Sequence, residues 1–137
     1  MVDADPDRAR DVDWLSGCAF AVRREAFEAV GGFDEGYFMY VEDVDLGLRL
    51  KRAGWRVRYE PSAVVEHRVG ASTSRRPARM VVEHARSLDR FYARRYPRTA
   101  GRWLRPLVRA GLGLWVGIVL AWHRLRGRRA GRSSTGE

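Results

Sequence analysis

The most informative stretch of this sequence covers residues 38–46 and reads Phe38-Met39-Tyr40-Val41-Glu42-Asp43-Val44-Asp45-Leu46. Three carboxylates lie within four positions, directly after a mostly apolar approach. The large apolar neighbours indicate that Glu42 and Asp43 lie at the wall of a pocket, where a carboxylate can accept a proton from a hydroxyl group. Acidic residues also favour the first turn of a helix. Both interpretations are compatible, because the start of a helix holds a carboxylate in a fixed position.

The composition is that of one domain or part of one, since the chain has 137 residues, of which 45% are hydrophobic and 31% charged. The net charge of +9 is unevenly distributed. Residues 1–74 carry 10 Lys+Arg against 14 Asp+Glu, whereas residues 75–137 carry 16 against 3. A basic half is typical of proteins that contact nucleic acid, anionic lipid or phosphorylated ligands. Cys18 is the only cysteine, which excludes an internal disulfide and a thiolate metal cluster.

Short apolar runs predict strands over residues 18–22, 55–59 and 63–65. Patterns with helical spacing predict helices over residues 24–30, 43–52, 78–96 and 102–125. Gly31 and Gly32 end the first of these helices, as a left-handed C-terminal cap does. Residues 1–13 have an acidic start, and we expect them to be loop or disordered.

The helix over residues 43–52 competes with a strand, because its valine and leucine side chains alternate with other residues. Three features favour the helix: the acidic first turn, the i,i+4 pair of Asp45 and Arg49, and Gly54 as a stop signal. Gly47 lies inside this helix, where a glycine costs roughly 1 kcal/mol relative to alanine. Its presence indicates close packing or the approach of a ligand.

The motifs of this chain, taken in order, resemble those of one enzyme family. They are Ser16-Gly17-Cys18-Ala19-Phe20-Ala21-Val22-Arg23-Arg24-Glu25-Ala26-Phe27, Val30-Gly31-Gly32-Phe33-Asp34-Glu35, the run at 38–46, Arg49-Leu50, Ala53-Gly54, Pro61 and His67. The series resembles the C-terminal half of family 2 glycosyltransferases with the GT-A fold, especially the rhamnosyltransferase-like bacterial branch. The resemblance covers roughly residues 13–96. It implies an α/β fold class, specifically a partial GT-A fold followed by C-terminal helices.

The resemblance implies that a sugar is transferred with inversion from a nucleotide-diphosphate donor to a hydroxyl acceptor, in the synthesis of cell-envelope polysaccharide or glycolipid. Asp43 matches the general base of the family, which makes it the predicted catalytic residue. Glu42 matches a residue that helps to hold the acceptor. Gly17, Phe33 and Asp34 match segments that shape the donor–acceptor cleft, and we assign them to acceptor binding on that basis.

The resemblance also implies a divalent metal, Mg or Mn, in the complete enzyme. His67 falls where many GT-A enzymes place a late histidine that contacts the metal or the diphosphate, although a histidine at the end of a strand is an equal alternative. Asp3-Ala4-Asp5 has the spacing of a metal-binding acidic pair, but no apolar strand precedes it, so we interpret it as solvated charge. On this basis the family's nucleotide-binding βαβ units and its metal-binding Asp-x-Asp motif are not identified in this chain. We therefore expect this chain to be the acceptor half of a longer enzyme and to be inactive by itself.

The basic half contains an uncharged stretch, Ala110–Trp122. As a helix it measures about 20 Å, which is shorter than the roughly 30 Å hydrocarbon core of a bilayer. Arginines flank both ends, and Trp103, Trp115 and Trp122 are spread along it. This pattern predicts a helix in the membrane interface that is held by anionic lipid. A full span with snorkelling arginines and a core helix packed on the catalytic domain are the alternatives.

The predicted organisation has four segments: residues 1–13 as loop or disordered chain, 14–98 as the C-terminal half of a glycosyltransferase domain, 99–125 as a membrane-associated helix and 126–137 as a basic disordered tail. The predicted enzyme is cytoplasmic and peripheral at the inner face of the cell membrane. Its partners are a nucleotide-diphosphate sugar and a saccharide or lipid-linked acceptor. The alternative is a non-catalytic basic module that binds membrane or nucleic acid. Nucleic acid is not a predicted partner, because the basic residues flank a very apolar segment without an aromatic–basic stacking platform.

Overall fold

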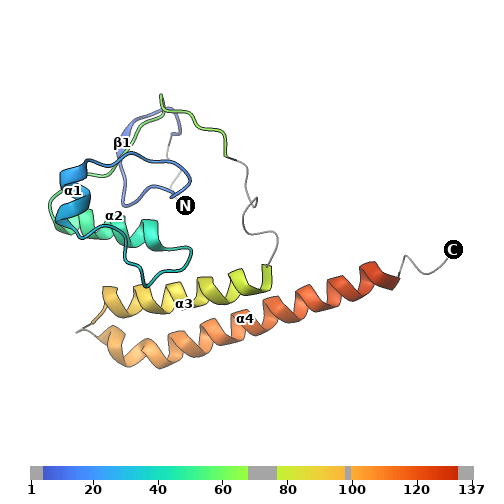
Figure 1. The fold of residues 1–137 in the computed structure, drawn as a ribbon. Helices are drawn as coiled ribbons and strands as arrows, with labels where there is room; N and C mark the ends of the chain where they lie inside the picture. Colours follow the sequence, from blue (N-terminus) through green and yellow to red (C-terminus); the bar gives the residue numbers. More distant parts are fainter. Residues whose placement is uncertain (1–4, 68–76, 98–99, 133–137) are drawn as a thin grey trace. The chain divides into compact units, whose positions relative to one another are not determined.

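A computed structural model of the chain describes residues 5–67, 77–97 and 100–132. Its elements are β1 (Arg10–Asp11), α1 (Arg24–Ala29), α2 (Glu42–Arg52), β2 (Arg58–Tyr59), α3 (Pro77–Arg95) and α4 (Ala100–Arg132) (Figure 1). The chain divides into two compact units, residues 1–69 and 70–137. The first unit contains both strands and the two short helices, and the second contains the two long helices. The division between the units thus falls inside the segment over residues 14–98 that the sequence analysis assigns to the glycosyltransferase domain, and that assignment stays a prediction.

The core of the first unit forms between α1 and α2. Ala26, Leu46 and Leu50 are its buried members. Leu46 and Leu50 are four positions apart, so that they lie on the same face of α2. Four partly buried side chains complete the core, namely Phe20, Phe27, Val30 and Val57. The core therefore uses one face of α2, the face that carries Leu46 and Leu50.

Helix α2 confirms the helix, rather than the strand, over residues 43–52. Its first turn follows a tight bend in which Tyr40 has a φ of 68° and Val41 a φ of 72°. Left-handed backbone is uncommon outside glycine and is a genuine outlier for a β-branched residue such as valine. This bend brings the chain directly from the aromatic run Phe38-Met39-Tyr40 into the helix at Glu42. Gly54, with a φ of 86°, ends the helix as predicted.

Gly47 lies where α2 packs against the preceding chain. A Cβ atom at this position would lie 2.8 Å from the carbonyl oxygen of Asp13 and 2.9 Å from the Cβ atom of Trp14. Real side chains do not approach so closely, so only glycine fits here without a shift of the backbone. The prediction of close packing at Gly47 is confirmed.

At Arg10–Asp11, strand β1 corrects the prediction that residues 1–13 are loop or disordered. It pairs antiparallel with β2, with Arg10 opposite Tyr59 and Asp11 opposite Arg58. The Arg10 guanidinium also lies over the Tyr59 ring, 4.7 Å from its centre, and the Tyr59 hydroxyl donates to the Pro6 carbonyl at 3.0 Å. The prediction was wrong for this segment because the groups that hold it are distant in sequence and leave no local pattern.

The strands predicted over residues 18–22 and 63–65 are not formed, and only Arg58–Tyr59 of the strand over 55–59 is paired. A strand is stable only when a neighbour satisfies its backbone N–H and C=O groups. Among the described residues, the sheet consists of β1 and β2 alone. The described fold is thus mainly helical with a small sheet, and the partial GT-A arrangement stays a prediction.

The second unit is a hairpin of α3 and α4, which run antiparallel and side by side (Figure 1). Asp89 of α3 accepts two hydrogen bonds from Arg105 of α4, at 3.1 and 3.0 Å. The rings of His84 and Trp115 meet edge to face with centroids 6.0 Å apart. These contacts join the middle of α3 to the first half of α4.

Helix α4 continues to Arg132, so the predicted disordered tail over residues 126–137 is wrong for residues 126–132. Arginine and alanine have high helix propensity, and adding residues to an existing helix is much easier than starting one. Residues 133–137 lie outside the described residues, as do residues 68–76.

Candidate active site

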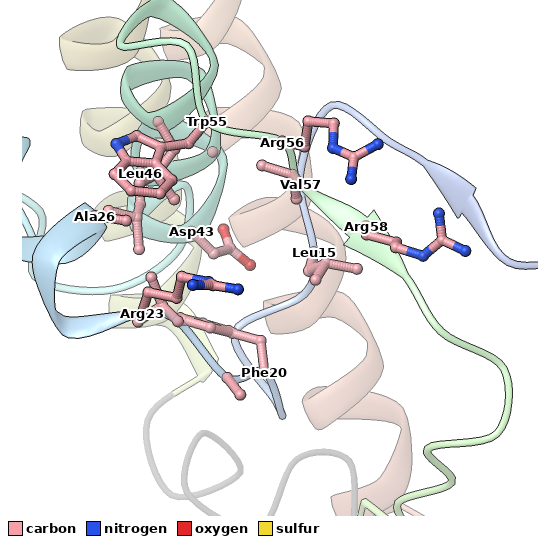
Figure 2. Close-up of a pocket in the computed structure, with 14 residues that line it drawn as sticks. Leu15, Phe20, Arg23, Ala26, Asp43, Leu46, Trp55, Arg56, Val57 and Arg58 are labelled. Carbon is pink, nitrogen blue, oxygen red and sulfur yellow. The ribbon is translucent and has the colours of Figure 1, made fainter.

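Asp43 lies in the first turn of α2 and lines a pocket of about 260 Å³ (Figure 2). Its carboxylate points into the space bordered by Leu15, Arg23 and Val57. Most of the wall is apolar, and Asp43 is the only acidic side chain that the described residues contribute to it. The predicted position of this carboxylate, at the wall of an apolar pocket, is thus found in the structure.

Two backbone amides orient the Asp43 carboxylate. The Gly17 N–H donates to Oδ2 at 2.8 Å, and the Val44 N–H donates to Oδ1 at 2.8 Å. Gly17 is 26 positions earlier in the chain, so this contact depends on the tertiary fold. A Cβ atom at Gly17 would lie 3.5 Å from Oδ2, which is an ordinary contact distance. The site therefore uses the Gly17 amide rather than the absence of a side chain.

A buried network beneath α2 holds the helix in place. Asp45 is 2% exposed, and Arg49 Nε donates to its Oδ2 at 2.7 Å. Arg49 Nη1 donates to the Val30 carbonyl at 2.6 Å, and the Tyr37 hydroxyl donates to Asp45 Oδ1 at 3.4 Å. The network joins α2 to the end of α1 and to the loop that precedes α2. It thereby supports the backbone from which Asp43 projects.

Three arginines also line the pocket, Arg23, Arg56 and Arg58, and the sequence analysis did not assign them to the site (Figure 2). Arg58 lies 3.9 Å from the Glu60 carboxylate. Guanidinium groups bind phosphate oxygens through paired N–H groups. The alternation of residues 55–59 offered a signal, because it places Arg56 and Arg58 on one side of an extended segment.

The other predicted acceptor-binding residues have structural contacts outside the pocket lining. Glu42 Oε2 is buried and has no hydrogen-bond partner within the described ranges. Phe33 packs edge to face against Phe27, with centroids 5.5 Å apart. Asp34 Oδ1 accepts the Gly36 N–H at 2.9 Å and so stabilises the turn before the aromatic run. The structure thus brings Gly17 and Asp43 together, while the acceptor roles of Glu42, Phe33 and Asp34 stay predictions.

His67 is exposed and is the last residue of the first described range. In the parts of the chain that the structure describes, no group of three or more His, Cys, Asp or Glu side chains is arranged to hold a metal ion. Mg²⁺ and Mn²⁺ prefer several oxygen ligands at once. The described residues therefore do not form a metal site by themselves, and a metal role for His67 stays a prediction.

Comparison with known proteins assigns the class. Residues 4–89 match the family described as Glycosyltransferase like family 2. This match covers more than half of the chain, so the protein belongs to glycosyltransferase family 2. Family membership confirms the resemblance drawn from the motifs, and it fits a GT-A-like fold.

Particular relatives are rhamnosyltransferases and an O-antigen protein. The chain is 47% identical, over 88% of its length, to an N-acetylglucosaminyl-diphospho-decaprenol L-rhamnosyltransferase of Mycobacterium tuberculosis. It is 40% identical over 61% of its length to the rhamnosyltransferase WbbL of Escherichia coli, and 44% identical over 44% to the O-antigen biosynthesis protein RfbC of Myxococcus xanthus. The chain spans 39%, 32% and 5% of these proteins, respectively. No solved structure matches it significantly.

Proposed function

We propose that this chain provides the acceptor side of a glycosyltransferase that moves a sugar, with inversion, from a nucleotide-diphosphate donor to a hydroxyl group of a lipid-linked saccharide. The observation that supports this most directly is the Asp43 carboxylate, held by two backbone amides at the wall of an apolar pocket. The names of the relatives favour L-rhamnose as the sugar and a polyprenyl-diphosphate-linked saccharide as the acceptor.

Asp43 acts as the general base of this reaction. It takes the proton of the acceptor hydroxyl while that oxygen forms a bond to the anomeric carbon of the donor sugar. The bond from the anomeric carbon to the diphosphate oxygen breaks, and its electron pair leaves with the diphosphate. Attack from the face opposite the leaving group inverts the anomeric configuration. The amides of Gly17 and Val44 keep the carboxylate in one orientation, which lowers the cost of reaching the reactive geometry.

Glu42 binds a second hydroxyl of the acceptor. A buried carboxylate oxygen without a donor is costly, and an acceptor hydroxyl would supply the donor that Oε2 lacks within the described residues. Phe33 and Asp34 shape the turn that leads to this part of the chain. Donor and acceptor meet at the inner face of the cell membrane, because nucleotide sugars are soluble whereas a polyprenyl-linked acceptor stays in the bilayer.

Transfer assays on the full-length gene product test the proposal. The donor is a nucleotide-diphosphate L-rhamnose, compared with other nucleotide sugars, and the acceptor is N-acetylglucosaminyl-diphospho-polyprenol. Asp43→Asn should lower the transfer rate by about 10²–10⁴-fold, the usual contribution of a general base. Asp11→Asn replaces an exposed aspartate outside the pocket and should leave the rate unchanged. An Asp43→Asn variant within a few-fold of wild type would contradict the assignment and move the base role to Glu42.

A further inference from the structure

Helix α4 carries an apolar side that the hairpin leaves uncovered. Its segment Gly101–Leu125 is long and apolar enough to cross a membrane by length and composition, and none of that apolar window is buried. The large apolar side chains on this side include Trp103 (84% exposed), Leu107 (69%), Leu114 (67%), Ile118 (60%) and Leu125 (60%). A contiguous exposed apolar surface marks a protein or membrane interaction site.

These five residues form one stripe along α4, called here the apolar stripe. Successive members are four or seven positions apart, the spacing that places side chains on one side of an α-helix. At 1.5 Å per residue the stripe is about 33 Å long. The residue spacing therefore combines side chains from the whole of Gly101–Leu125 into one continuous surface.

The arginines that interrupt the apolar sequence of α4 point away from the stripe. Arg105 forms two hydrogen bonds with Asp89 of α3, and Arg109 Nε lies 3.6 Å from the same carboxylate. These contacts show that Arg105 and Arg109 face α3. Arginines interrupt the apolar sequence of α4, but in the folded helix they lie on the side that contacts α3. The opposite side of α4 is apolar.

We propose that the apolar stripe lies flat in the interface of an anionic lipid bilayer, with α3 on the aqueous side. Helix α3 packs along α4 from the Asp89–Arg105 contact to the His84–Trp115 contact and would have to enter the bilayer if α4 crossed it. It carries many charged side chains, and charges in the hydrocarbon core are costly. In the flat orientation only the stripe enters the bilayer. This orientation corresponds to the interfacial helix predicted from the sequence, rather than to the full span or the core helix.

Charge complementarity identifies the lipid as anionic. Arg124 is exposed beside Leu125 at the C-terminal end of the stripe, where it can reach lipid headgroups, and residues 75–137 as a whole carry 16 Lys+Arg against 3 Asp+Glu. Basic residues beside an apolar helix surface strengthen binding to negatively charged leaflets. Trp103 within the stripe and Trp122, which is 50% exposed beside it, belong to the residue type that prefers the headgroup level of a membrane.

Vesicle flotation of the full chain tests the docking surface, and its readout is independent of the catalytic proposal. The chain should float with phosphatidylcholine vesicles that contain phosphatidylglycerol, and less with phosphatidylcholine alone. Combined Leu107→Gln, Leu114→Gln and Ile118→Gln should lower the partition coefficient at least about tenfold, because binding scales with the apolar area inserted. Val64→Gln with Val65→Gln is the matched control, since it removes exposed apolar side chains outside α4 and should not change partitioning. Equal flotation of the stripe variant and wild type, at unchanged circular dichroism, would overturn the proposal.

A depth measurement separates the flat orientation from a span. Cys18→Ser removes the only cysteine, and Leu107→Cys, Leu114→Cys or Leu125→Cys then introduces one labelling site each along the stripe. An environment-sensitive fluorophore at each site is quenched by lipids brominated at different depths of the acyl chain. The flat orientation predicts the same shallow depth at all three sites. A label at position 114 that lies deeper than those at 107 and 125 would overturn the flat orientation.

Discussion

At the scale of single residues, two aspartates of one motif have different tasks. The carboxylate of Asp43 lines the pocket and accepts hydrogen bonds from two backbone amides. Asp45 is almost fully buried and forms an ion pair with Arg49 at 2.7 Å. Asp43 and Asp45 face different surroundings because they are two positions apart on a helix, which is roughly half a turn. Substitution of each should therefore separate chemistry from stability.

Asp45→Asn is expected to destabilise the first unit by about 3–5 kcal/mol, because it leaves the mostly buried Arg49 guanidinium without its charge partner. Asp43→Asn keeps an acceptor oxygen for only one of the two backbone amides, but it leaves no buried charge unpaired, so it should change stability less than Asp45→Asn. Urea denaturation of both variants, followed by tryptophan fluorescence, measures the difference. Equal losses of unfolding free energy in the two variants would show that the network beneath α2 does not have the stabilising role given to it here.

Gly17 provides a second test at this scale, since its amide rather than its size contacts Asp43. Gly17→Ala keeps the N–H and places the new Cβ at an ordinary 3.5 Å from Oδ2, so sugar transfer should stay close to wild type. Gly17→Pro removes the N–H and should lower the transfer rate markedly, because one carboxylate oxygen loses its orienting donor. The sugar-transfer rates of the two variants show whether the site needs the amide at position 17. Loss of activity in Gly17→Ala as well would mean that the site requires the glycine itself.

At the scale of elements, Gly47 decides how closely α2 approaches the chain before it. Gly47→Ala gains about 1 kcal/mol of helix propensity but forces a Cβ to within 2.8 Å of the Asp13 carbonyl oxygen, and overpacking typically costs about 1–3 kcal/mol. We expect a net destabilisation, measured by chemical denaturation of the full chain.

Gly113→Ala is the matched control for this substitution. Gly113 lies inside α4 and has no atom within 4 Å of an added Cβ, so only the propensity gain of up to about 1 kcal/mol applies. If Gly47→Ala increases the free energy of unfolding, as Gly113→Ala should, then the contact of α2 with Asp13 and Trp14 adjusts without cost.

At the scale of the whole molecule, the two units should respond separately to acid. The hydrogen bond from Arg105 lowers the pKa of Asp89 below its ordinary value of 3.8. Burial raises this pKa by a smaller amount, and the positive charges of Arg105 and Arg109 lower it further. A lowered pKa means that the unfolded chain binds the proton more tightly, so the stabilisation is complete above the unfolded value of about 4 and is lost as the pH falls through the folded value.

Acid titration of the full chain, followed residue by residue with amide hydrogen exchange, measures this response. Amide protection in α3 and α4 should decrease when the pH is lowered below about 4. Asp89→Asn should reduce this protection already at neutral pH and should remove the decrease that comes from protonation of Asp89. The pair is partly exposed, so the effect should stay at or below about 1 kcal/mol. Asp34→Asn, which affects a turn of the first unit, is the control and should leave the hairpin unchanged. An unchanged pH profile in Asp89→Asn would contradict the role of the Asp89–Arg105 pair.

The sequence by itself determined the features that depend on neighbours along the chain. Helices α1, α3 and most of α4 follow from their apolar patterns, whereas α2 follows from its acidic first turn and the Asp45–Arg49 pair. The stop at Gly54 follows from a single residue type. The family resemblance was equally local, since it rests on ordered short motifs, and the match over residues 4–89 confirms it.

Tertiary structure alone decided which distant residues meet. It paired β1 with β2, placed the Gly17 amide on Asp43, and set the Asp13 backbone against Gly47. It also turned Arg105 toward Asp89, which converts an interrupted apolar sequence into a helix with one continuous apolar side. Such contacts join residues that are far apart in sequence, and they depend on the path of the chain between them. Short-range periodicity contains no information about that path, which is the physical reason why these features appear only in the folded molecule.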